Sequence, residues 1–382
     1  MEKWLEQTLG EVTAYMAKGI PPKYVEEEGP STIRVLNQKC NRNFVISYSD
    51  SRVHDNGAKR VPAEKMLREN DVLVNSTGTG TAGRIAQIWS VPTPTTIDGH
   101  MILLRPSSAV DPLYYGYAIK AFQAQIESFA EGSTGQTEIN KKRLQDEIII
   151  RFPGSLEIQR SIGRLFRDID DKIQANEAIN DNLEQQVSAI YQAWFEDFER
   201  YDGVCPQLWK QGVLADIASI TSGKRPPMKS TDKTDAAIIP LVGAASVMGY
   251  TSEANHTDKI LVTGRVGTHG VIQRFNTPCW TSDNTLVITS DFYEYTYQIL
   301  QRIDYHSMNR GSTQPLITQG DMNKTAILMP DKKTLHEFET LAGQLMAQFE
   351  ANIQENSKLA ELRDALLPKL MSGELDVSDI DL

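Results

Sequence analysis

The chain has 382 residues, with 39 Lys or Arg, 50 Asp or Glu and a formal net charge of −11. This length allows two globular domains with connecting helices, and the acidic balance at first argues against a nucleic-acid-binding protein. No apolar stretch is long enough to cross a membrane, and the N-terminal residues lack a basic region followed by an apolar run, so we expect a soluble intracellular protein. The cysteines Cys40, Cys205 and Cys279 show no metal or redox spacing, which favours a reducing cytoplasm without a disulfide framework.

The acidic excess is concentrated in part of the chain. Segment 1–154 carries 18 acidic and 18 basic residues, and 203–330 carries 10 acidic and 11 basic residues. The surplus of acid therefore lies on 155–202, on 331–373 and on the tail from Glu374. A charge-balanced domain can still present one basic face, so the composition permits DNA binding without requiring it.

The first globular segment is predicted to form small mixed sheets with a helix. Short β-branched runs between turn residues, such as 33–36 and 71–74, predict strands. A tyrosine-rich helical stretch around Tyr114 follows, and we expect its tyrosines in the core. The run Gly-Ser-Thr-Gly-Gln at 132–136 then precedes a last strand that ends at Pro153.

The same order of features returns after residue 203, which indicates an internal repeat. Both copies open with a Trp and a Leu, and both end with a strand that runs into a proline. The matched segments share their residue pattern: 71–74 with 258–261, 80–83 with 267–270, 97–102 with 282–287, and 132–136 with 311–314. The first two pairs have a constant offset of 187 residues, and the 97–102 pair is expected to form strands.

Each globular segment is followed by a long amphipathic helix. The segments 173–183 and 349–359 share an Ala-Asn, Asn and Leu pattern, and apolar residues around them recur at spacings of three and four. Two such helices most simply bury their stripes on each other as an antiparallel coiled coil, in which asparagines restrict the register. The alternative is two unrelated surface helices, each packed on its own domain. The predicted seam consists of Ile169, Ile173, Asn176, Asn180, Leu183, Val187, Leu345, Phe349, Asn352, Asn356, Leu359 and Leu366.

No catalytic or metal-binding constellation is evident. The run 78–83 spells the GxGxxG fingerprint, but a dinucleotide site needs a helix next, and 84–91 is predicted as a strand. The run 223–225 lacks the Ser or Thr of a phosphate loop, and the six histidines form no zinc spacing. We therefore expect no catalytic residue, no metal and no cofactor in this chain.

The repeated loops carry side chains that suit DNA. Ser and Thr hydroxyls bond phosphate, and a Gln amide pairs bidentately with adenine. The alternative for each loop is an ordinary turn, each basic residue taken singly is more often a solvated charge, and His269 also has a turn or core interpretation. The candidates for DNA contact are Lys18, Lys23, Lys59, Arg60, Arg84, Ser133, Thr134, Gln136, Lys141, Lys142, Lys224, Arg225, Lys229, Arg265, His269, Arg274, Arg310, Ser312, Thr313, Gln314 and Lys324.

This organisation resembles the specificity subunit of type I restriction-modification enzymes. The resemblance rests on the duplicated unit and helix, on Gly-Ser-Thr-x-Gln or its shortened form before the last strand, and on the closing run Leu-Leu-Pro-Lys-Leu-Met-Ser-Gly-Glu-Leu at 366–375. It implies an α+β fold with two similar mixed α/β target recognition domains, separated by two long helices packed as an antiparallel coiled coil, with an internal pseudo-twofold. The implied divisions are domain 1 at 1–153, a central spacer helix at 154–202, domain 2 at 203–330, a C-terminal spacer helix at 331–373 and an acidic tail at 374–382.

The resemblance also implies a function without catalysis in this chain. Each domain is expected to recognise one half of a bipartite target in double-stranded DNA, with no membrane partner. The chain is expected to position two methyltransferase subunits, which use S-adenosylmethionine to methylate adenine, and to recruit restriction and translocase subunits that use ATP and Mg. The second loop is one residue shorter, which leaves the pairing of base contacts between the domains open.

A helix of about 40 residues is roughly 60 Å long, so the spacer length is expected to set the unread gap of the target. Two other functions stay open. One is a non-catalytic scaffold with duplicated protein-binding domains, whose binding would depend little on salt, and the other is a nucleotide-dependent transferase built on the loop at residue 78. The DNA sequence, and the choice between restriction and methylation alone, depend on loop geometry and on neighbouring subunits.

Overall fold

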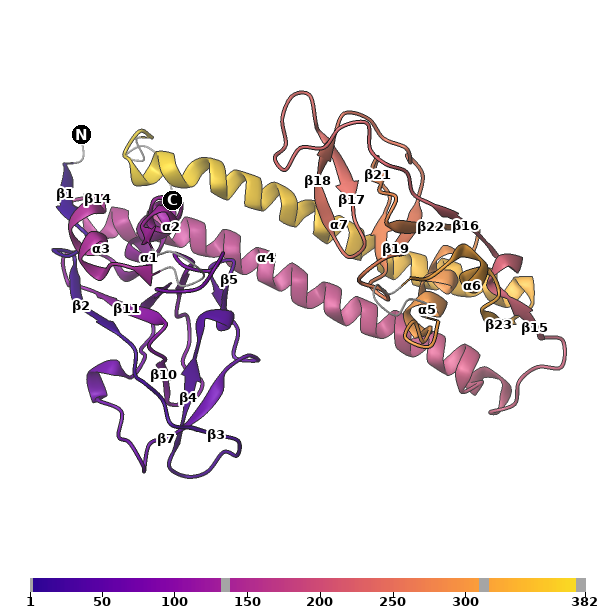
Figure 1. Cartoon of the computed structure of the whole chain (residues 1–382), viewed down its shortest axis with the longest axis horizontal. Coiled ribbons are helices and arrows are strands. Elements are labelled where there is room, and N and C mark those ends of the chain that lie inside the picture. Colours follow the sequence, from indigo (N-terminus) through magenta and orange to yellow (C-terminus); the bar gives the residue numbers. More distant parts are fainter. Residues whose placement is uncertain (1–2, 132–137, 309–315, 376–382) are drawn as a thin grey trace. The chain divides into compact units, whose positions relative to one another are not determined.

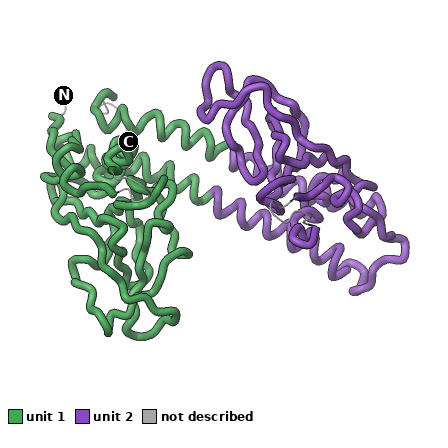
Figure 2. Tube along the Cα trace, viewed as in Figure 1, with its two compact units in different colours: residues 1–175, 354–382 green, residues 176–353 purple. Residues whose placement is uncertain are grey.

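The computed structural model describes residues 3–131, 138–308 and 316–375. The chain forms two compact units, unit 1 with Met1–Ala175 and Gln354–Leu382, and unit 2 with Asn176–Ile353 (Figure 2). Each unit combines a globular α/β part with one stretch of each of two long helices, and each buries a core of its own. Among the described helices, none has the length and apolarity that crossing a membrane requires.

The central sheet of unit 1 is antiparallel, with strand order β2-β11-β8-β9. Figure 1 labels its strands β2 and β11. Its strands are β2 (Thr13–Lys18), β8 (Val72–Asn75), β9 (Ile85–Gln87) and β11 (Met101–Pro106). Successive side chains of a strand point to opposite faces. Val72 and Val74 therefore join the core under the helices, whereas Leu73 joins a smaller core on the other face with Leu103. The sheet is buried on both faces.

A second sheet of unit 1 has the order β10-β4-β7-β3, and its β10 pairs in parallel with β4. Its strands are β3 (Tyr24–Val25), β4 (Thr32–Leu36), β7 (Arg52–Asp55) and β10 (Thr95–Ile97). The outer pair β1 (Trp4–Thr8) and β14 (Ile149–Pro153) is antiparallel. The remaining short elements are η1 (Gln38–Cys40), β5 (Asn41–Arg42), β6 (Val45–Ile46), η2 (Ala63–Lys65), β12 (Ala130–Glu131) and β13 (Glu138–Ile139).

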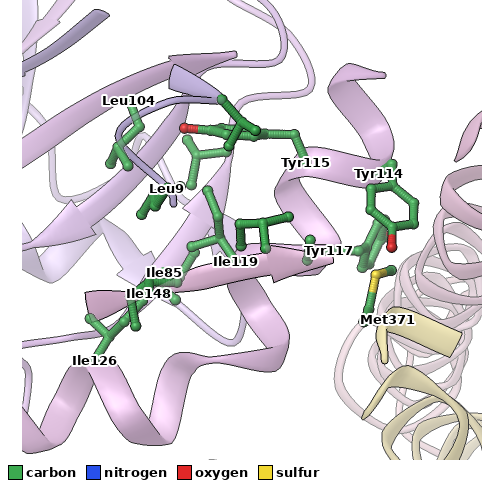
Figure 3. Packing of buried hydrophobic residues seen from close by; sticks show 14 of the residues in the cluster. Leu9, Ile85, Leu104, Tyr114, Tyr115, Tyr117, Ile119, Ile126, Ile148 and Met371 are labelled. Atoms are coloured by element: carbon green, nitrogen blue, oxygen red, sulfur yellow. The ribbon is translucent and has the colours of Figure 1, made fainter. Parts of the chain in front are cut away.

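Helix α1 (Pro112–Ala121) covers the central sheet of unit 1, followed by α2 (Gln123–Ser128) and α3 (Lys141–Glu147). Asp111 caps α1 by accepting a hydrogen bond from the Leu113 N–H at 3.0 Å, and proline at the first helical position suits this start. The tyrosines of α1 are fully buried, as expected, and Figure 3 shows Tyr114 beside Met371 in this core.

Unit 2 repeats the main strand pairings of this topology. Its central sheet has the order β16-β22-β19-β20, its second sheet β18-β17-β21 again contains one parallel pair, and β15 pairs with β23 as β1 does with β14. The strands are β15 (Lys210–Val213), β16 (Ala218–Ser222), β17 (Ile239–Val242), β18 (Val247–Thr251), β19 (Ile260–Gly264), β20 (Gln273–Phe275), β21 (Trp280–Thr281), β22 (Thr285–Ser290) and β23 (Ala326–Met329). With η5 (Leu214–Asp216), α5 (Tyr293–Arg302) and α6 (Gln319–Asn323), this order confirms the predicted duplication.

Two long helices run through the chain, α4 (Leu156–Tyr191) and α7 (Lys332–Met371). In unit 1, Arg363 pairs with Asp170 at 2.6 Å, and the Asn356 amide donates to the Ile173 carbonyl at 3.3 Å. The residue number on α4 rises from 170 to 173 while that of its partner on α7 falls from 363 to 356, so the two helices are antiparallel. The alternative of unrelated surface helices is wrong.

Asparagines form side-chain hydrogen bonds between the two helices in unit 2. The Asn352 Nδ2 donates to the Asn180 Oδ1 at 2.8 Å, and the Asn180 Nδ2 donates to the Phe349 carbonyl at 3.2 Å. Of the predicted seam, the buried members are Ile169, Asn176, Asn180, Leu183, Val187 and Asn352, and the partly buried members are Ile173, Leu345, Phe349, Asn356, Leu359 and Leu366.

Helix α4 ends earlier than the sequence suggested. A single π turn, η3 (Gln192–Glu196), follows it, and then the short 3-10 turn η4 (Glu199–Tyr201). Phe198 and Asp202, which flank this turn, have φ of 54° and 53°. Left-handed residues cannot continue a right-handed helix, so the helix ends before residue 202.

Buried charges connect the helices of unit 1 to its globular part. Asp170 on α4 accepts a hydrogen bond from the Tyr117 hydroxyl at 2.8 Å and lies 3.5 Å from the Lys120 ammonium. Burial raises the pKa of Tyr117, and the nearby Asp170 carboxylate raises it further. Burial lowers the pKa of Lys120 to about 8, although the Asp170 charge opposes that shift.

Unit 2 has a different buried cluster. Arg274 on β20 pairs with Glu294 of α5 at 2.6 Å and with Glu350 of α7 at 3.3 Å, and Lys259 lies 3.1 Å from Glu294. The Glu339 carboxylate of α7 accepts hydrogen bonds from the first turn of α5, including that of the Tyr295 N–H at 2.7 Å. This cap replaces the aspartate that begins α1 in unit 1.

Candidate nucleic-acid interface

In unit 1, main-chain hydrogen bonds hold several turns together at one end of the central sheet. Gly19, just after β2, donates to the Met101 carbonyl at 3.1 Å, and Ser76 donates to the His100 carbonyl at 2.9 Å. A Cβ on Gly19 would lie 2.1 Å from the Asp98 carbonyl oxygen, so only glycine permits this approach. The glycine turn after β8 is thereby held against the turn at 98–100.

Unit 2 repeats these bonds one for one. Gly223 donates to the Thr285 carbonyl at 3.1 Å, and Arg265 donates through its main chain to the Asn284 carbonyl at 2.8 Å. A Cβ on Gly223 would lie 2.1 Å from the Ser282 carbonyl oxygen. We call these contacts, with their counterparts in unit 1, the main-chain frame.

A third segment joins the frame in both units. Ile139 donates to the Ser76 carbonyl at 2.8 Å in unit 1, and Ile317 donates to the Arg265 carbonyl at 3.0 Å in unit 2. These segments come directly after the predicted Gly-Ser-Thr loops. The loop candidates themselves lie outside the described residues: Ser133, Thr134, Gln136, Arg310, Ser312, Thr313 and Gln314.

The frame corrects two matches made from sequence. Met101 pairs with Asn75, and Thr285 pairs with Gly264, which makes Asn75 equivalent to Gly264. The match of 71–74 with 258–261 is therefore wrong by two residues, and the match of 97–102 with 282–287 is wrong by one. The two matches aligned Asp71 with Asp258 and Asp98 with Asp283. The structural equivalence of the two units is instead set by strand pairing between segments that are distant in the sequence.

The turns at 98–100 and 282–284 were predicted as strand and are not. Each lies between a strand of the second sheet, β10 or β21, and a strand of the central sheet, β11 or β22. The chain must turn here because it changes sheets. The sequence analysis therefore did not select these residues as site candidates. Their occurrence at matching places in both repeats was the feature of the sequence that could have identified them.

The basic candidates of unit 1 fall into two groups. Several contact their own domain: Lys18 pairs with Glu138, Lys59 donates to the Pro21 carbonyl at 3.0 Å, Lys141 to the Met16 carbonyl at 3.4 Å, and Arg84 to the Gly80 carbonyl at 2.9 Å. The others are exposed and have no side-chain partner among the residues that the structure describes: Lys23, Arg60 and Lys142. Arg84 also lines a hollow of about 580 Å³ with Arg42, which sequence reasoning did not select.

In unit 2, Lys224, Arg225 and Lys229 are exposed next to the frame. Lys324, at the end of α6, is exposed as well. The His269 Nδ1 lies 3.1 Å from the Gly264 carbonyl oxygen, which fits the turn interpretation of this residue. Arg225 and Lys229 line a hollow of about 510 Å³.

Arg274 does not fit the candidate interface. Its side chain is 7% exposed and is held by two carboxylates of its own unit. Withdrawing the guanidinium from these carboxylates to meet a phosphate would leave buried acids unpaired, which is strongly unfavourable. We therefore remove Arg274 from the candidates for DNA contact.

The aspartate of the unit 1 turn is already used within the fold. Asp98 is 5% exposed and accepts a hydrogen bond from the His100 N–H at 2.9 Å. Burial raises the pKa of Asp98, although this hydrogen bond opposes the shift. Within the described part of the chain, no cluster of three or more His, Cys, Asp or Glu residues is arranged to hold a metal ion.

Comparisons with known proteins agree with this architecture. The chain matches the family described as type I restriction modification DNA specificity domain over residues 1–185 and 206–362. It is 26% identical over 306 residues to the MjaIX specificity subunit of Methanocaldococcus jannaschii, which covers 70% of this chain and 69% of that protein. It is 20% identical over 469 aligned residues to the HindI specificity subunit of Haemophilus influenzae, which covers 98% of this chain and 100% of that protein.

A solved structure shows a similar fold. The S subunit of the type I restriction-modification system from M. genitalium aligns over 97% of this chain and 96% of its own length, with a TM-score of 0.62 and 16% identity. At this identity the likeness concerns the fold alone.

Proposed function

The chain belongs to the type I restriction-modification DNA specificity family, and from this premise we propose that its two units each read one half of a bipartite target in duplex DNA. The chain is the specificity subunit of such a system, and it contributes recognition rather than catalysis. Its partners are DNA and the other subunits of the restriction-modification complex.

The main-chain frame carries this proposal. In both units the same hydrogen bonds bring the residue after the first sheet strand, the glycine turn and the turn between the sheets to one place. Exposed cations follow its glycines Gly19 and Gly223 in the sequence, Lys23 in unit 1 and Arg225 in unit 2. Cations contact phosphates and fix the position of a protein on DNA, whereas polar turn side chains read base edges.

We assign two methyltransferase subunits and the restriction subunits as the protein partners. The duplicated unit offers two equivalent docking surfaces, which suits two copies of one subunit. The cofactors S-adenosylmethionine and ATP with Mg belong to those subunits, and such a complex works in the cytoplasm, where the DNA is.

Salt dependence tests DNA recognition. The chain is assembled with its methyltransferase subunits, and its affinity for duplex DNA is measured from low to physiological salt. Each lost phosphate contact reduces the slope of log affinity against log salt by about 0.9. The triple variant Lys224→Ala, Arg225→Ala, Lys229→Ala is therefore expected to weaken binding and flatten this slope. Neutralising Lys332, Lys333 and Lys358, three exposed lysines of α7, is the matched control.

DNA binding that does not depend on salt, or no retention of DNA at all, would favour the scaffold alternative instead.

A domain exchange tests whether the two units recognise their half-sites independently. Replacing 203–330 with the equivalent segment of another family member is expected to change one half-site only, as read from the methylated adenines. A change in both half-sites contradicts independent reading by the two units.

A further inference from the structure

A hollow in unit 2 lies where the loop after Gly223 meets the turn at 282–284. Its volume is about 510 Å³, within the roughly 300–1,000 Å³ of sites that enclose small chemical groups. Prolines and methionines give it apolar walls, and charged and polar side chains complete it. The charged and polar lining residues are Arg225, Lys229, Ser282, Asp283 and Asn284.

One wall holds a polar group that lacks a partner. Ser282 is 3% exposed, and its Oγ is buried without a hydrogen-bond partner in the described part of the protein. Buried polar groups in folded proteins are almost always hydrogen-bonded. The described residues do not supply the hydrogen bond that this hydroxyl needs.

The backbone of this turn is rigid, and its side chains are free. Ser282 donates through its N–H to the Val242 carbonyl at 3.0 Å, and the Thr285 Oγ1 donates to the Ser282 carbonyl at 2.7 Å. The side chains of Asp283 and Asn284 are exposed and make no hydrogen bond to any described residue. The fixed backbone is preorganised for recognition, because the turn needs no further backbone ordering on binding, and the unbonded side chains are available to a ligand.

Charge narrows the class of ligand. Arg225 and Lys229 are exposed and form no ion pair with the described residues, so they attract phosphate. Asp283 in the same hollow repels phosphate, and a carboxylate at a DNA face therefore needs a hydrogen-bond donor. In the major groove the exocyclic amino groups of adenine and cytosine are the donors on base edges.

We propose that this hollow reads one base of the half-site recognised by unit 2, with Asp283 accepting a hydrogen bond from the amino group of adenine or cytosine. Asn284 contacts the same base or its neighbour, and Arg225 and Lys229 hold the adjoining phosphates. This assignment rests on the proposed function and names the residues that determine specificity within it.

The equivalent turn of unit 1 shows why the assignment is specific to unit 2. Asp98, which corresponds to Ser282, accepts the His100 N–H at 2.9 Å and lies 3.5 Å from the Tyr24 hydroxyl. The His100 Nδ1 is within 2.8 Å of the Thr77 hydroxyl. These side chains bond one another, so the two units present different chemistry from the same main-chain frame.

The test uses the full chain assembled with its methyltransferase subunits. The probe is a library of DNA duplexes with a randomised stretch, and the methylated adenines are read by sequencing. In the Asp283→Ala variant, one position of one half-site is expected to lose its preference for adenine or cytosine by roughly 5- to 150-fold. All other positions, and the other half-site, are expected to stay unchanged.

Asp291→Ala is the matched control, because Asp291 is an exposed carboxylate at the opposite end of β22 from Asp283. This variant is expected to methylate the wild-type sequence. The thermal unfolding midpoints of both variants are measured, since exposed substitutions should leave them unchanged. The double variant Arg225→Ala, Lys229→Ala is expected to lower methylation at every sequence without changing the consensus.

Three outcomes are distinguishable. A wild-type complex that methylates no defined bipartite sequence overturns the proposed function. A wild-type consensus that Asp283→Ala leaves intact overturns the assignment of the hollow and leaves the proposed function standing. Loss of preference at a position where wild type selects guanine or thymine overturns the acceptor role of Asp283.

Discussion

Replacing Glu294 with alanine measures how much a buried ion pair stabilises unit 2. Glu294 is 2% exposed and accepts hydrogen bonds from Arg274 at 2.6 and 2.8 Å, and Arg274 is itself 7% exposed. Without the carboxylate, Glu350, at 3.3 Å, is the one acidic partner that the buried guanidinium keeps among the described residues. Removing one partner of a buried pair destabilises by roughly 3–5 kcal/mol, a large part of the roughly 5–15 kcal/mol that stabilises a domain.

The effect of this substitution depends on pH. Burial by itself would raise the pKa of Glu294, but hydrogen bonds and charge from Arg274 outweigh burial and lower it. A carboxyl whose folded pKa is depressed stabilises the fold above its unfolded pKa and loses that contribution as pH falls through the folded pKa. The difference between wild type and Glu294→Ala is therefore expected to be full at neutral pH and to shrink in acid.

Hydrogen exchange resolved by peptide is the appropriate assay, because a chain with two units need not unfold in one step. Amides of α5 and β20 are expected to exchange roughly 2 to 4 orders of magnitude faster in Glu294→Ala, while amides of β8 and β11 in unit 1 serve as an internal reference. The matched control is Glu337→Ala, whose carboxylate is 38% exposed and pairs with Arg200 at 2.9 Å. An exposed pair of this kind contributes about 0–1 kcal/mol. Equal effects of the two substitutions would refute the argument.

Three further predictions concern the long helices. Burial raises the pKa of Glu339 to about 7, although main-chain hydrogen bonds to the carboxylate oppose the shift. The free energy of unfolding should therefore fall as pH rises from the ordinary glutamate range toward 7. Urea titrations at several pH values should show that Glu339→Gln flattens this dependence. Asn352→Ala leaves the Asn180 Oδ1 without its donor and should destabilise by roughly 1–3 kcal/mol, whereas Leu at both positions should recover much of the loss in thermal unfolding. Deleting 173–179 together with 350–356 removes seven residues from each helix and keeps the apolar repeat. It should shorten the unread gap of the target by about three base pairs, with both half-sites intact. An unchanged gap in the methylated sequences would exclude the helices as the spacer.

Features with a local cause were predictable from sequence. The spacing of apolar residues on one helical face predicted both long helices and their pairing, because burial of a stripe requires a partner. The buried tyrosines of α1 and α5, and the repeated strands, followed from residue type and order. Glycines such as Gly19 and Gly223 marked matching turns, since each lies where no side chain fits.

Features set by contacts between distant segments were not predictable. The equivalence of Asp98 with Ser282 depends on hydrogen bonds to strands far away in the sequence, so aligning aspartates gave the wrong register. The burial of Arg274 depends on acids of α5 and α7, and a lone arginine in a strand reads as a surface charge. The hollow of unit 2 likewise exists only once two loops meet.

The main-chain frame affects how the recognised DNA sequence can evolve. Amide and carbonyl groups hold its turns, and every residue type except proline carries both groups. Substitutions at the turn tips can thus accumulate without loosening the scaffold that presents them. A few point mutations can then change the DNA sequence that is recognised, while the other subunits of the complex stay the same.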